Sequence, residues 1–238
     1  MKILIVNDDS ISAPGIAVLA KAALEFGEVT VVAPAEQCSA LSQKLTLREK
    51  LRLEQVRDFP VAVKAAWKLE GTPVDCVKVA LEGILEEKPD WVFSGINHGY
   101  NAGFDIAYSG TLGAAFEAAR NGISSIALSI AHEKYLAAAE SLLPAVLREL
   151  LPQTPGMGQV WNVNFPSMKP GNPKGILWDR TVATTSMYRE HYARRLLEDG
   201  SFELTCVGRP TEDTDIPAGS DAEAVRRGYI SIGKVRAF

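Results

Sequence analysis

The chain begins Met1-Lys-Ile-Leu-Ile-Val-Asn-Asp-Asp-Ser10, a short apolar run that ends abruptly in an amide, two carboxylates and a hydroxyl. Residues 3–6 are continuously apolar rather than alternating, which is typical of a strand covered on both faces in a parallel sheet. Such sheets bind ligands at the carboxyl ends of their strands. We therefore expect a ligand site at residues 7–10.

This expected site contains two adjacent acids, Asp8 and Asp9, preceded by Asn7. Adjacent carboxylates repel each other unless a cation or a bound proton intervenes, and Mg2+ or Mn2+ prefers carboxylate, amide and water oxygens. The pair therefore indicates a metal ion. A polar turn in which Asp9 or Ser10 caps the following helix is the better explanation of an isolated pair, so the metal hypothesis depends on the rest of the chain.

The whole-chain composition is that of a folded α/β protein. Its 238 residues, 47% of them hydrophobic, fit one large domain or a core domain with an appendage. With 25 basic and 29 acidic residues the formal charge is −4, and no basic run could follow a nucleic-acid backbone, so polymeric nucleic acid is not expected as the main partner. The chain shows neither a cleavable signal segment nor an apolar run of about 20 residues, which predicts a cytoplasmic protein without a membrane partner.

The three cysteines and three histidines are scattered, without C-x-x-C, H-x-H or H-E-x-x-H spacing. Neither a disulfide framework nor a zinc site is predicted. A bound metal must therefore be held by oxygen ligands.

A β-α-β unit follows the first strand. Residues 15–26 are strong helix formers ended by Gly27, and residues 29–33 form a second buried strand. Short loops join these elements, which predicts a right-handed parallel crossover and a Rossmann-like sheet. Neither G-x-G-x-x-G nor the Walker P-loop sequence occurs, so NAD binding and P-loop nucleotide hydrolysis lose their usual support.

Further elements continue this pattern to about residue 165. Thr72 and Pro73 are placed as the N-cap and first residue of a helix that reaches Leu85. The other expected elements are antiparallel edge strands in 44–57 and 61–69, strands at 91–94 and 124–129, and a long helix at 133–151.

Small polar residues follow several of these strands. Ser39 comes after the second strand, Asn97 and Asn101 lie in a glycine-rich loop after the strand at 91–94, and Ser109 or Thr111 caps the next helix. Ser39 alone is explained equally well by a solvated loop. Together with the acidic pair, these loops offer a hard cation carboxylate, hydroxyl and amide oxygens beside a helix N-terminus that binds anions. This combination predicts phosphoryl transfer from a phosphate monoester to water.

Seven short motifs occur in order along nearly the whole chain: N-D-D, V-A-P-x-x-x-x-S, G-T-P-x-D-C, S-G-I-N-x-G-x-N, Y-S-G-T, N-V-N-x-P and G-Y-I-S-I. In their order and spacing the chain resembles the SurE family of metal-dependent survival-protein nucleotidases. The resemblance implies a Rossmann-like domain with a C-terminal oligomerising arm. It also implies hydrolysis of nucleoside 5'- and 3'-monophosphates, with some members cleaving polyphosphate.

The resemblance assigns residues to two roles, and we expect one Mg2+ or Mn2+ per subunit. The implied metal ligands are Asp8, Asp9, Ser39 and Asn97. The expected substrate-binding residues are Asn7, Asn101, Ser109, Gly110 and Thr111. We expect the catalytic residues to be Asp8, Asp9 and Asn97, with either aspartate as the base for an attacking water.

One position departs from the family motif, which usually reads N-D-D-G where this chain has Ser10. Only glycine tolerates a positive φ freely, so we expect strain in the turn that presents the two aspartates. The expected consequence is a change in rate or metal preference and not in fold.

The C-terminal third, residues 166–238, loses the β-α rhythm. Residues 188–195 and 202–207 resemble an extended arm or hairpin, and a short helix at 221–228 precedes a strand at 229–232. Arms of this kind exchange between subunits, so we expect a catalytic core at 1–165, an oligomerising remainder and a homodimer or homotetramer. The alternative is an arm folded back on its own domain.

Two other functions fit part of the pattern. A phosphatase of the haloacid-dehalogenase type forms an aspartyl phosphate but uses D-x-D, whereas Asp8 and Asp9 are adjacent. A nucleotide-binding module without turnover is the second, and only Ser10 supports it.

Overall fold

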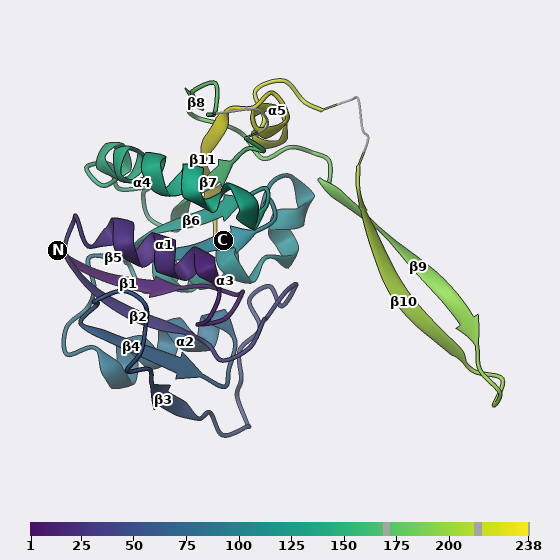
Figure 1. The fold of residues 1–238 in the computed structure, drawn as a ribbon, viewed down its shortest axis with the longest axis horizontal. Coiled ribbons are helices and arrows are strands. Elements are labelled where there is room, and N and C mark those ends of the chain that lie inside the picture. Colours follow the sequence, from purple (N-terminus) through teal and green to yellow (C-terminus); the bar gives the residue numbers. More distant parts are fainter. Residues whose placement is uncertain (169–171, 212–215, 238) are drawn as a thin grey trace.

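A nine-stranded sheet with helices on both faces forms the core of the computed structural model, which describes residues 1–168, 172–211 and 216–237 (Figure 1). Its strands are β1 (Lys2–Val6), β2 (Glu28–Pro34), β3 (Leu53–Gln55), β4 (Ala65–Leu69), β5 (Trp91–His98), β6 (Ser124–Ile130), β7 (Gln159–Phe165), β8 (Ile176–Leu177) and β11 (Ile230–Arg236). They lie in the order β3-β4-β2-β1-β5-β6-β7-β11-β8, and all pairs from β4 to β7 are parallel. The predicted Rossmann-like, mostly parallel sheet is confirmed.

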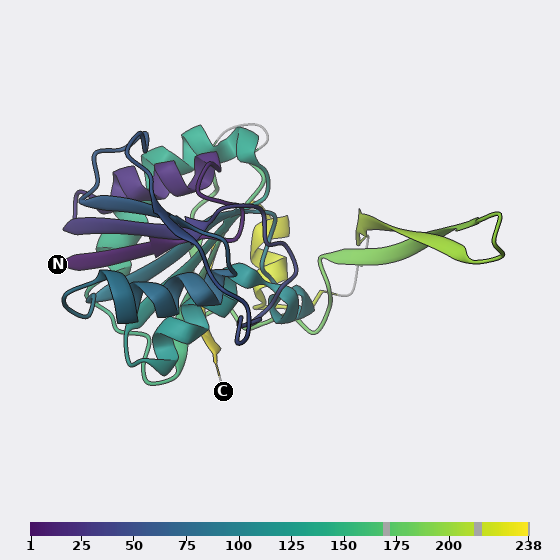
Figure 2. The same ribbon diagram turned by 90° about the horizontal axis from the view of Figure 1, so that it is seen from below.

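The helices form a layer on each face of this sheet. They are α1 (Pro14–Ala23), α2 (Pro73–Val79), α3 (Gly110–Arg120), α4 (Leu136–Leu150) and α5 (Asp221–Arg226). Helices α1 and α4 cover one face and α2 and α3 the other (Figure 2). Among the described residues, no helix is both long and apolar enough to cross a lipid bilayer.

The opening strand shows why its sequence is continuously apolar. Ile3 and Ile5 pack in the hydrophobic cluster under α1 and α4, whereas Leu4 and Val6 pack in the cluster under α2. Successive side chains of a strand point to opposite faces, so a strand with helices on both sides needs an apolar residue at every position.

The start of α2 also follows the sequence. Thr72 accepts a hydrogen bond at Oγ1 from the Asp75 N–H, at 3.2 Å, and the Asp75 carboxylate accepts one from the Thr72 N–H, at 2.9 Å. This reciprocal capping box satisfies two of the N–H groups that a helix start leaves without partners. The helix then widens into a π-helical turn at Ala80–Ile84.

The edge of the sheet differs from the expected antiparallel pair. Strand β3 has three residues and pairs antiparallel with β4, as expected, but β4 itself runs parallel to β2. Most of the β-rich run at 44–57 is not in a strand. A period-2 pattern reports that a segment is extended and says nothing of the direction of its neighbour.

The C-terminal segment returns to the large sheet. Strand β11 pairs antiparallel with β7, and the two-residue β8 pairs parallel with β11. Strands β8 and β11, which follow the expected boundary at residue 165, therefore belong to the same sheet as the core strands. The division into a catalytic core and an oligomerising remainder stays a prediction. Parts of the 166–238 segment, at 169–171, 212–215 and 238, lie outside the described residues.

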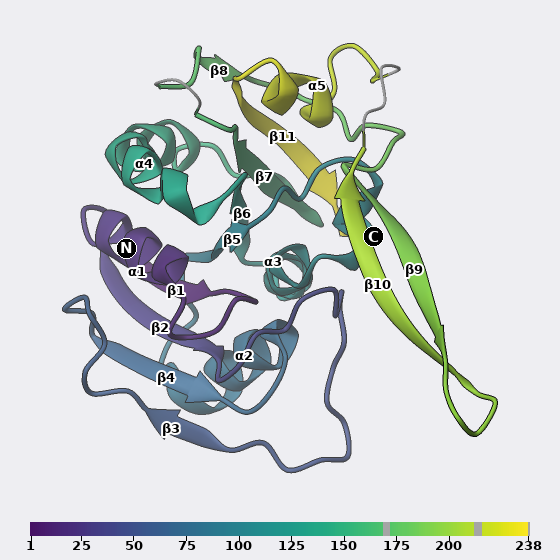
Figure 3. The same ribbon diagram turned by 45° about the vertical axis from the view of Figure 1, so that its right-hand side comes forward.

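Between β8 and β11 the chain leaves the core as an antiparallel hairpin, β9 (Tyr188–Leu196) and β10 (Phe202–Pro210). This arm projects from the side of the molecule that lies opposite the N-terminus (Figures 1 and 3). Nearly all its residues are exposed. The predicted hairpin is confirmed, whereas its role in assembly stays a prediction.

Candidate functional site

The strand order of the sheet reverses at β1. From β1 the chain builds outward through β2 and β4 on one side and through β5, β6 and β7 on the other. Ligands of open α/β sheets bind at such a switch point, beyond the carboxyl ends of the strands. Asp8 and Asp9 follow β1, and Asn97 lies at the end of β5. Strand β5 is longer than the predicted 91–94 and includes Asn97, so this residue lies in the strand and not in the loop after it. The ends of β1 and β5 meet at the expected edge.

Asp8 is the centre of a buried polar network. Its Oδ1 accepts a hydrogen bond from the Thr111 hydroxyl at 2.8 Å. The Asn101 side-chain amide donates to Thr111 Oγ1 at 3.1 Å and to Ser129 Oγ at 2.8 Å. These four residues are all at most 5% exposed. The network joins the ends of β1 and β6, the loop after β5 and the start of α3.

The first turn of α3 lies against Asp8. Ser109 is its N-cap and accepts a hydrogen bond from the Leu112 N–H at 3.1 Å, which decides between the two predicted caps. A Cβ added to Gly110 would lie 3.0 Å from the Cβ of Asp8 and 3.1 Å from its Oδ2. Glycine at this position thus allows the start of the helix to approach the carboxylate closely. Such a helix start binds anions.

Burial perturbs both acids. It raises the pKa of Asp8 from 3.8 to about 7, with a further upward contribution from the neighbouring Asp9 charge. Burial also raises the pKa of Asp9, although the backbone N–H of His98 donates to its Oδ2 at 2.9 Å. Adjacent residues that carry buried carboxylates favour a bound cation, which would stabilise their charged forms.

Asn7 shapes the turn after β1. It is fully buried, and its side-chain amide donates to the Ser10 carbonyl at 2.7 Å. Ser10 has a φ of +91°, a value that favours glycine, so the expected backbone strain is present. The buried Oδ1 of Asn7 has no partner among the described residues.

Ser39 and Asn97 lie at the rim of the site. The Asn97 side-chain amide donates to the Gly99 carbonyl at 2.9 Å, and the Ser39 hydroxyl accepts from Gln37 at 3.0 Å. The Ser39 loop is tied to the site because the Cys38 N–H donates to the Asp8 carbonyl at 2.7 Å. Both side chains are more accessible than Asp8.

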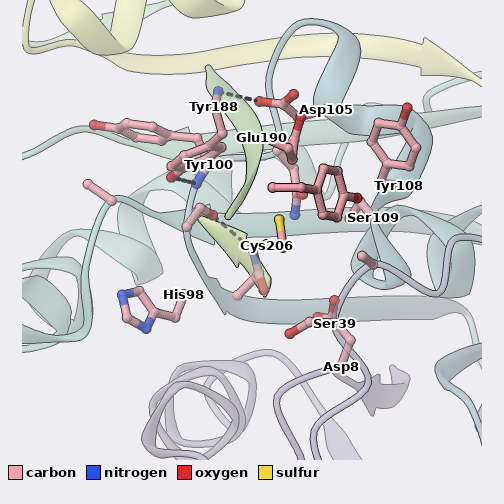
Figure 4. Close-up of a pocket in the computed structure, with 16 residues that line it drawn as sticks. Asp8, Ser39, His98, Tyr100, Asp105, Tyr108, Ser109, Tyr188, Glu190 and Cys206 are labelled. Carbon is pink, nitrogen blue, oxygen red and sulfur yellow. Dashed lines mark hydrogen bonds between the residues drawn. The ribbon is translucent and has the colours of Figure 1, made fainter. Parts of the chain in front are cut away.

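These residues open into a cleft of about 960 Å³ (Figure 4). The predicted site residues that line it are Asp8, Ser39, Asn97, Asn101 and Ser109. The other predicted residues, Asn7, Asp9, Gly110 and Thr111, are neighbours of these in the chain, and the Asp9 carboxylate accepts a hydrogen bond from the His98 N–H at the same edge of the sheet. The predicted residues therefore gather at one cleft, and their roles in it stay a prediction.

Comparison with known proteins identifies the family. The family profile described as Survival protein SurE matches residues 3–193. The chain belongs to the SurE family. It is 39% identical to the 5'-nucleotidase SurE of Synechococcus sp. (strain JA-3-3Ab), with 98% of this chain and 90% of that protein covered. It is 35% identical to the 5'/3'-nucleotidase SurE of Yersinia enterocolitica, with the same coverage.

The fold agrees with this assignment. The crystal structure of the SurE protein from Aquifex aeolicus matches with a TM-score of 0.84 and 31% identity, covering 100% of this chain and 94% of that one. The resemblance expected from the seven motifs is therefore confirmed.

A SurE-family motif that the sequence reasoning left without a role, N-V-N-x-P, positions the site. Asn162 and Asn164 of β7 both donate side-chain hydrogen bonds to the Asn101 carbonyl, at 2.8 and 3.0 Å. Asn164 also accepts from the Asn101 N–H at 2.9 Å. The two asparagines alternate in the strand and so share a face, which was a usable signal.

The residues present fit a divalent metal. Within the described part of the chain, no group of three or more His, Cys, Asp or Glu side chains could hold a metal ion. An ion at the cleft would therefore combine the two carboxylates with neutral oxygens, as hard cations accept. The raised pKa of each acid is the observation that favours such an ion.

Proposed function

We propose that this SurE-family protein is a divalent-metal-dependent phosphomonoesterase that hydrolyses nucleoside 5'- and 3'-monophosphates to nucleoside and phosphate. The main support is the buried Asp8 carboxylate, joined through Thr111 to the start of α3 at the switch point of the sheet. This arrangement puts acid oxygens beside an anion-binding helix start. The printed names of the relatives, 5'-nucleotidase and 5'/3'-nucleotidase, agree with it.

In this proposal one Mg2+ or Mn2+ per subunit is held by Asp8, Asp9, Ser39 and Asn97. When bound, the cation supplies Lewis-acid polarisation of water and of a phosphoryl oxygen. The short Thr111 to Asp8 hydrogen bond orients one carboxylate, and the His98 N–H orients the other.

The phosphate end of the substrate is bound by neutral donors in this proposal. The N–H groups at the start of α3, with Ser109, Gly110 and Thr111, stabilise the charge that develops on the phosphoryl oxygens. Asn101 holds Thr111 in place. Asp8 or Asp9 accepts the proton of the attacking water. Asn7 contributes by holding the turn that carries both acids.

The deciding experiment measures phosphate release from several mononucleotides and a short polyphosphate, after chelation and with Mg2+ or Mn2+ restored. Metal-dependent release from mononucleotides supports the proposal. Nucleotide binding without release would favour a binding module. Single-turnover hydrolysis in 18O water distinguishes the mechanisms, because oxygen from solvent should enter the phosphate directly, whereas oxygen from the protein would indicate an aspartyl phosphate.

We also propose that the arm mediates a homodimer or homotetramer, and that the protein is cytoplasmic. A two-stranded hairpin is marginally stable alone, and this one exposes Leu196 (64%), Phe202 (50%) and Leu204 (59%). A partner copy would cover them. Light scattering should report at least a dimer, and deletion of 188–207 should release monomers. A wild-type monomer at micromolar concentration would contradict the assembly.

A further inference from the structure

The root of the arm forms one wall of the catalytic cleft. Tyr188, Glu190 and Tyr192 of β9 line the cleft together with Cys206 of β10. Alternate residues of a strand share a face, and Cys206 is paired directly with Tyr192. One face of the hairpin is therefore turned toward the cleft, and the opposite face carries the neighbouring Arg189 and His191.

The root is fastened to the loop that carries the phosphate-side residues. Asp105 lies in the 3-10 turn Phe104–Tyr108, and its Oδ2 accepts hydrogen bonds from the N–H groups of Met187, at 2.7 Å, and Tyr188, at 3.2 Å. The Tyr188 hydroxyl accepts from the Tyr100 N–H at 3.3 Å. These bonds hold the first residues of β9 at the cleft.

Two accessible aromatic rings line this part of the cleft. Tyr192 of the arm is 65% exposed, and Tyr108 of the core is 61% exposed. An aromatic side chain that is exposed in a cleft offers a flat apolar surface. Any of the nucleobases can stack on such a surface.

Glu190 lies between Tyr188 and Tyr192 on the same face. Within the described ranges its carboxylate has no hydrogen-bond or ion-pair partner, and it is exposed. Figure 4 shows Glu190 and Tyr108 on the side of the cleft away from Asp8 and Ser39. Because a carboxylate repels a phosphate dianion and only accepts hydrogen bonds, it suits the nucleoside end of a substrate.

We propose that the arm root is the nucleobase subsite, in which Tyr192 and Tyr108 stack on the base and Glu190 accepts hydrogen bonds from its N–H groups. Guanine presents two adjacent N–H donors, whereas uracil presents one donor between two carbonyl oxygens, so Glu190 favours guanine over uracil. This inference rests on the proposed nucleotidase function. It adds a substrate preference that depends on the arm of the same chain.

The experiment compares kcat/KM of the metal-loaded protein for GMP, UMP and ribose 5-phosphate, which lacks a base. Tyr192→Ala should lower the ratio of GMP to ribose 5-phosphate about tenfold, within the range for loss of one stacked base. Tyr192→Phe keeps the ring and should preserve the ratio. His191→Ala, on the opposite face of the same strand, is the matched control and should leave the ratio unchanged.

Glu190→Gln tests the hydrogen bonds separately and should lower the ratio of GMP to UMP about fivefold, the lower end of the range for loss of a bidentate contact to a base. An unchanged ratio in Tyr192→Ala, or a wild type that does not distinguish GMP from ribose 5-phosphate, overturns the subsite and leaves the nucleotidase intact. Failure of the wild type on all three substrates overturns the nucleotidase itself. Light scattering is run on every variant, and a ratio that falls only with dissociation assigns Tyr192 to assembly instead.

Discussion

The two ends of the cleft are built in opposite ways. At the Asp8 end, polar side chains are buried and each is held by partners from different elements of the core sheet. At the arm end, Glu190 and Tyr192 are exposed on a hairpin outside that sheet. A buried, connected network resists substitution because every change leaves a polar group without a partner, whereas an exposed strand face tolerates it. The proposed chemistry at the Asp8 end is therefore less open to substitution than the proposed base selectivity at the arm end.

The largest effect is expected at the buried end. Asp8→Asn and Asp9→Asn should each lower metal-dependent turnover by about 1000-fold or more, since each removes a proposed metal ligand and a candidate base. Phosphate release measures the loss of turnover, and calorimetric titration with Mg2+ or Mn2+ measures the loss of metal affinity. Asp199→Asn in the exposed turn of the arm is the control. Near-normal turnover and metal affinity in both variants would rule out the assignment.

The raised pKa of Asp8 predicts how stability depends on pH in the metal-free protein. The folded protein retains a proton on Asp8 that the unfolded chain releases, because the pKa is about 7 in the fold and 3.8 in the reference state. The stabilisation that this proton gives the folded protein is complete below pH 3.8 and is lost as the pH rises through about 7. The free energy of unfolding should fall across this range by up to about 4 kcal/mol relative to Asp8→Asn.

Urea titrations with chelator at both ends of that pH range measure this difference. Asp8→Asn should then be the more stable protein at alkaline pH, although it is inactive. Added Mg2+ or Mn2+ should restore the stability of the wild type most strongly at the higher pH. If the free energy of unfolding changed with pH in the same way in both proteins, burial would not raise the pKa of Asp8 as described.

A matched pair of threonines contrasts the two regions directly. Thr111→Val removes the hydroxyl that links Asp8 and Asn101, so it should lower the free energy of unfolding by about 1–3 kcal/mol and reduce turnover. Thr205→Val makes the same change on the exposed arm and should alter stability by less than about 0.5 kcal/mol. Denaturation and kinetics on both variants check the contrast. Equal effects would mean that the Thr111 hydrogen bonds contribute little.

The smallest effect is expected at Ser10. Ser10→Gly relieves a φ of +91° and should raise the free energy of unfolding by about 1 kcal/mol. Ser12→Gly, two residues further on, has no such strain to relieve and should be neutral or destabilising. Thermal denaturation compares them. If Ser10→Gly destabilises the protein as much as the control does, the turn stores no strain.

Particular elements show how far sequence reasoning reached. The continuous run in β1 and the Thr72-Pro73 helix start follow from local rules, and both are as expected. The direction of β4 and the return of β11 to the sheet were missed, because an apolar strand pattern is compatible with either neighbour and either orientation. Local sequence patterns therefore predict strands and helix starts but not which distant strands pair with each other.

For the site, the sequence alone determined the residue types and the sheet edge: adjacent acids after one strand, amides after another and a capped helix start. Those conclusions need only the order of the elements, because parallel strands present their carboxyl ends together. Only the tertiary structure decided that Thr111 donates to Asp8, that Asn162 and Asn164 hold Asn101, and that the arm root lines the cleft. Each of these contacts joins residues far apart in the chain. Whether such residues meet in space depends on how whole elements pack, and no local sequence pattern contains that information.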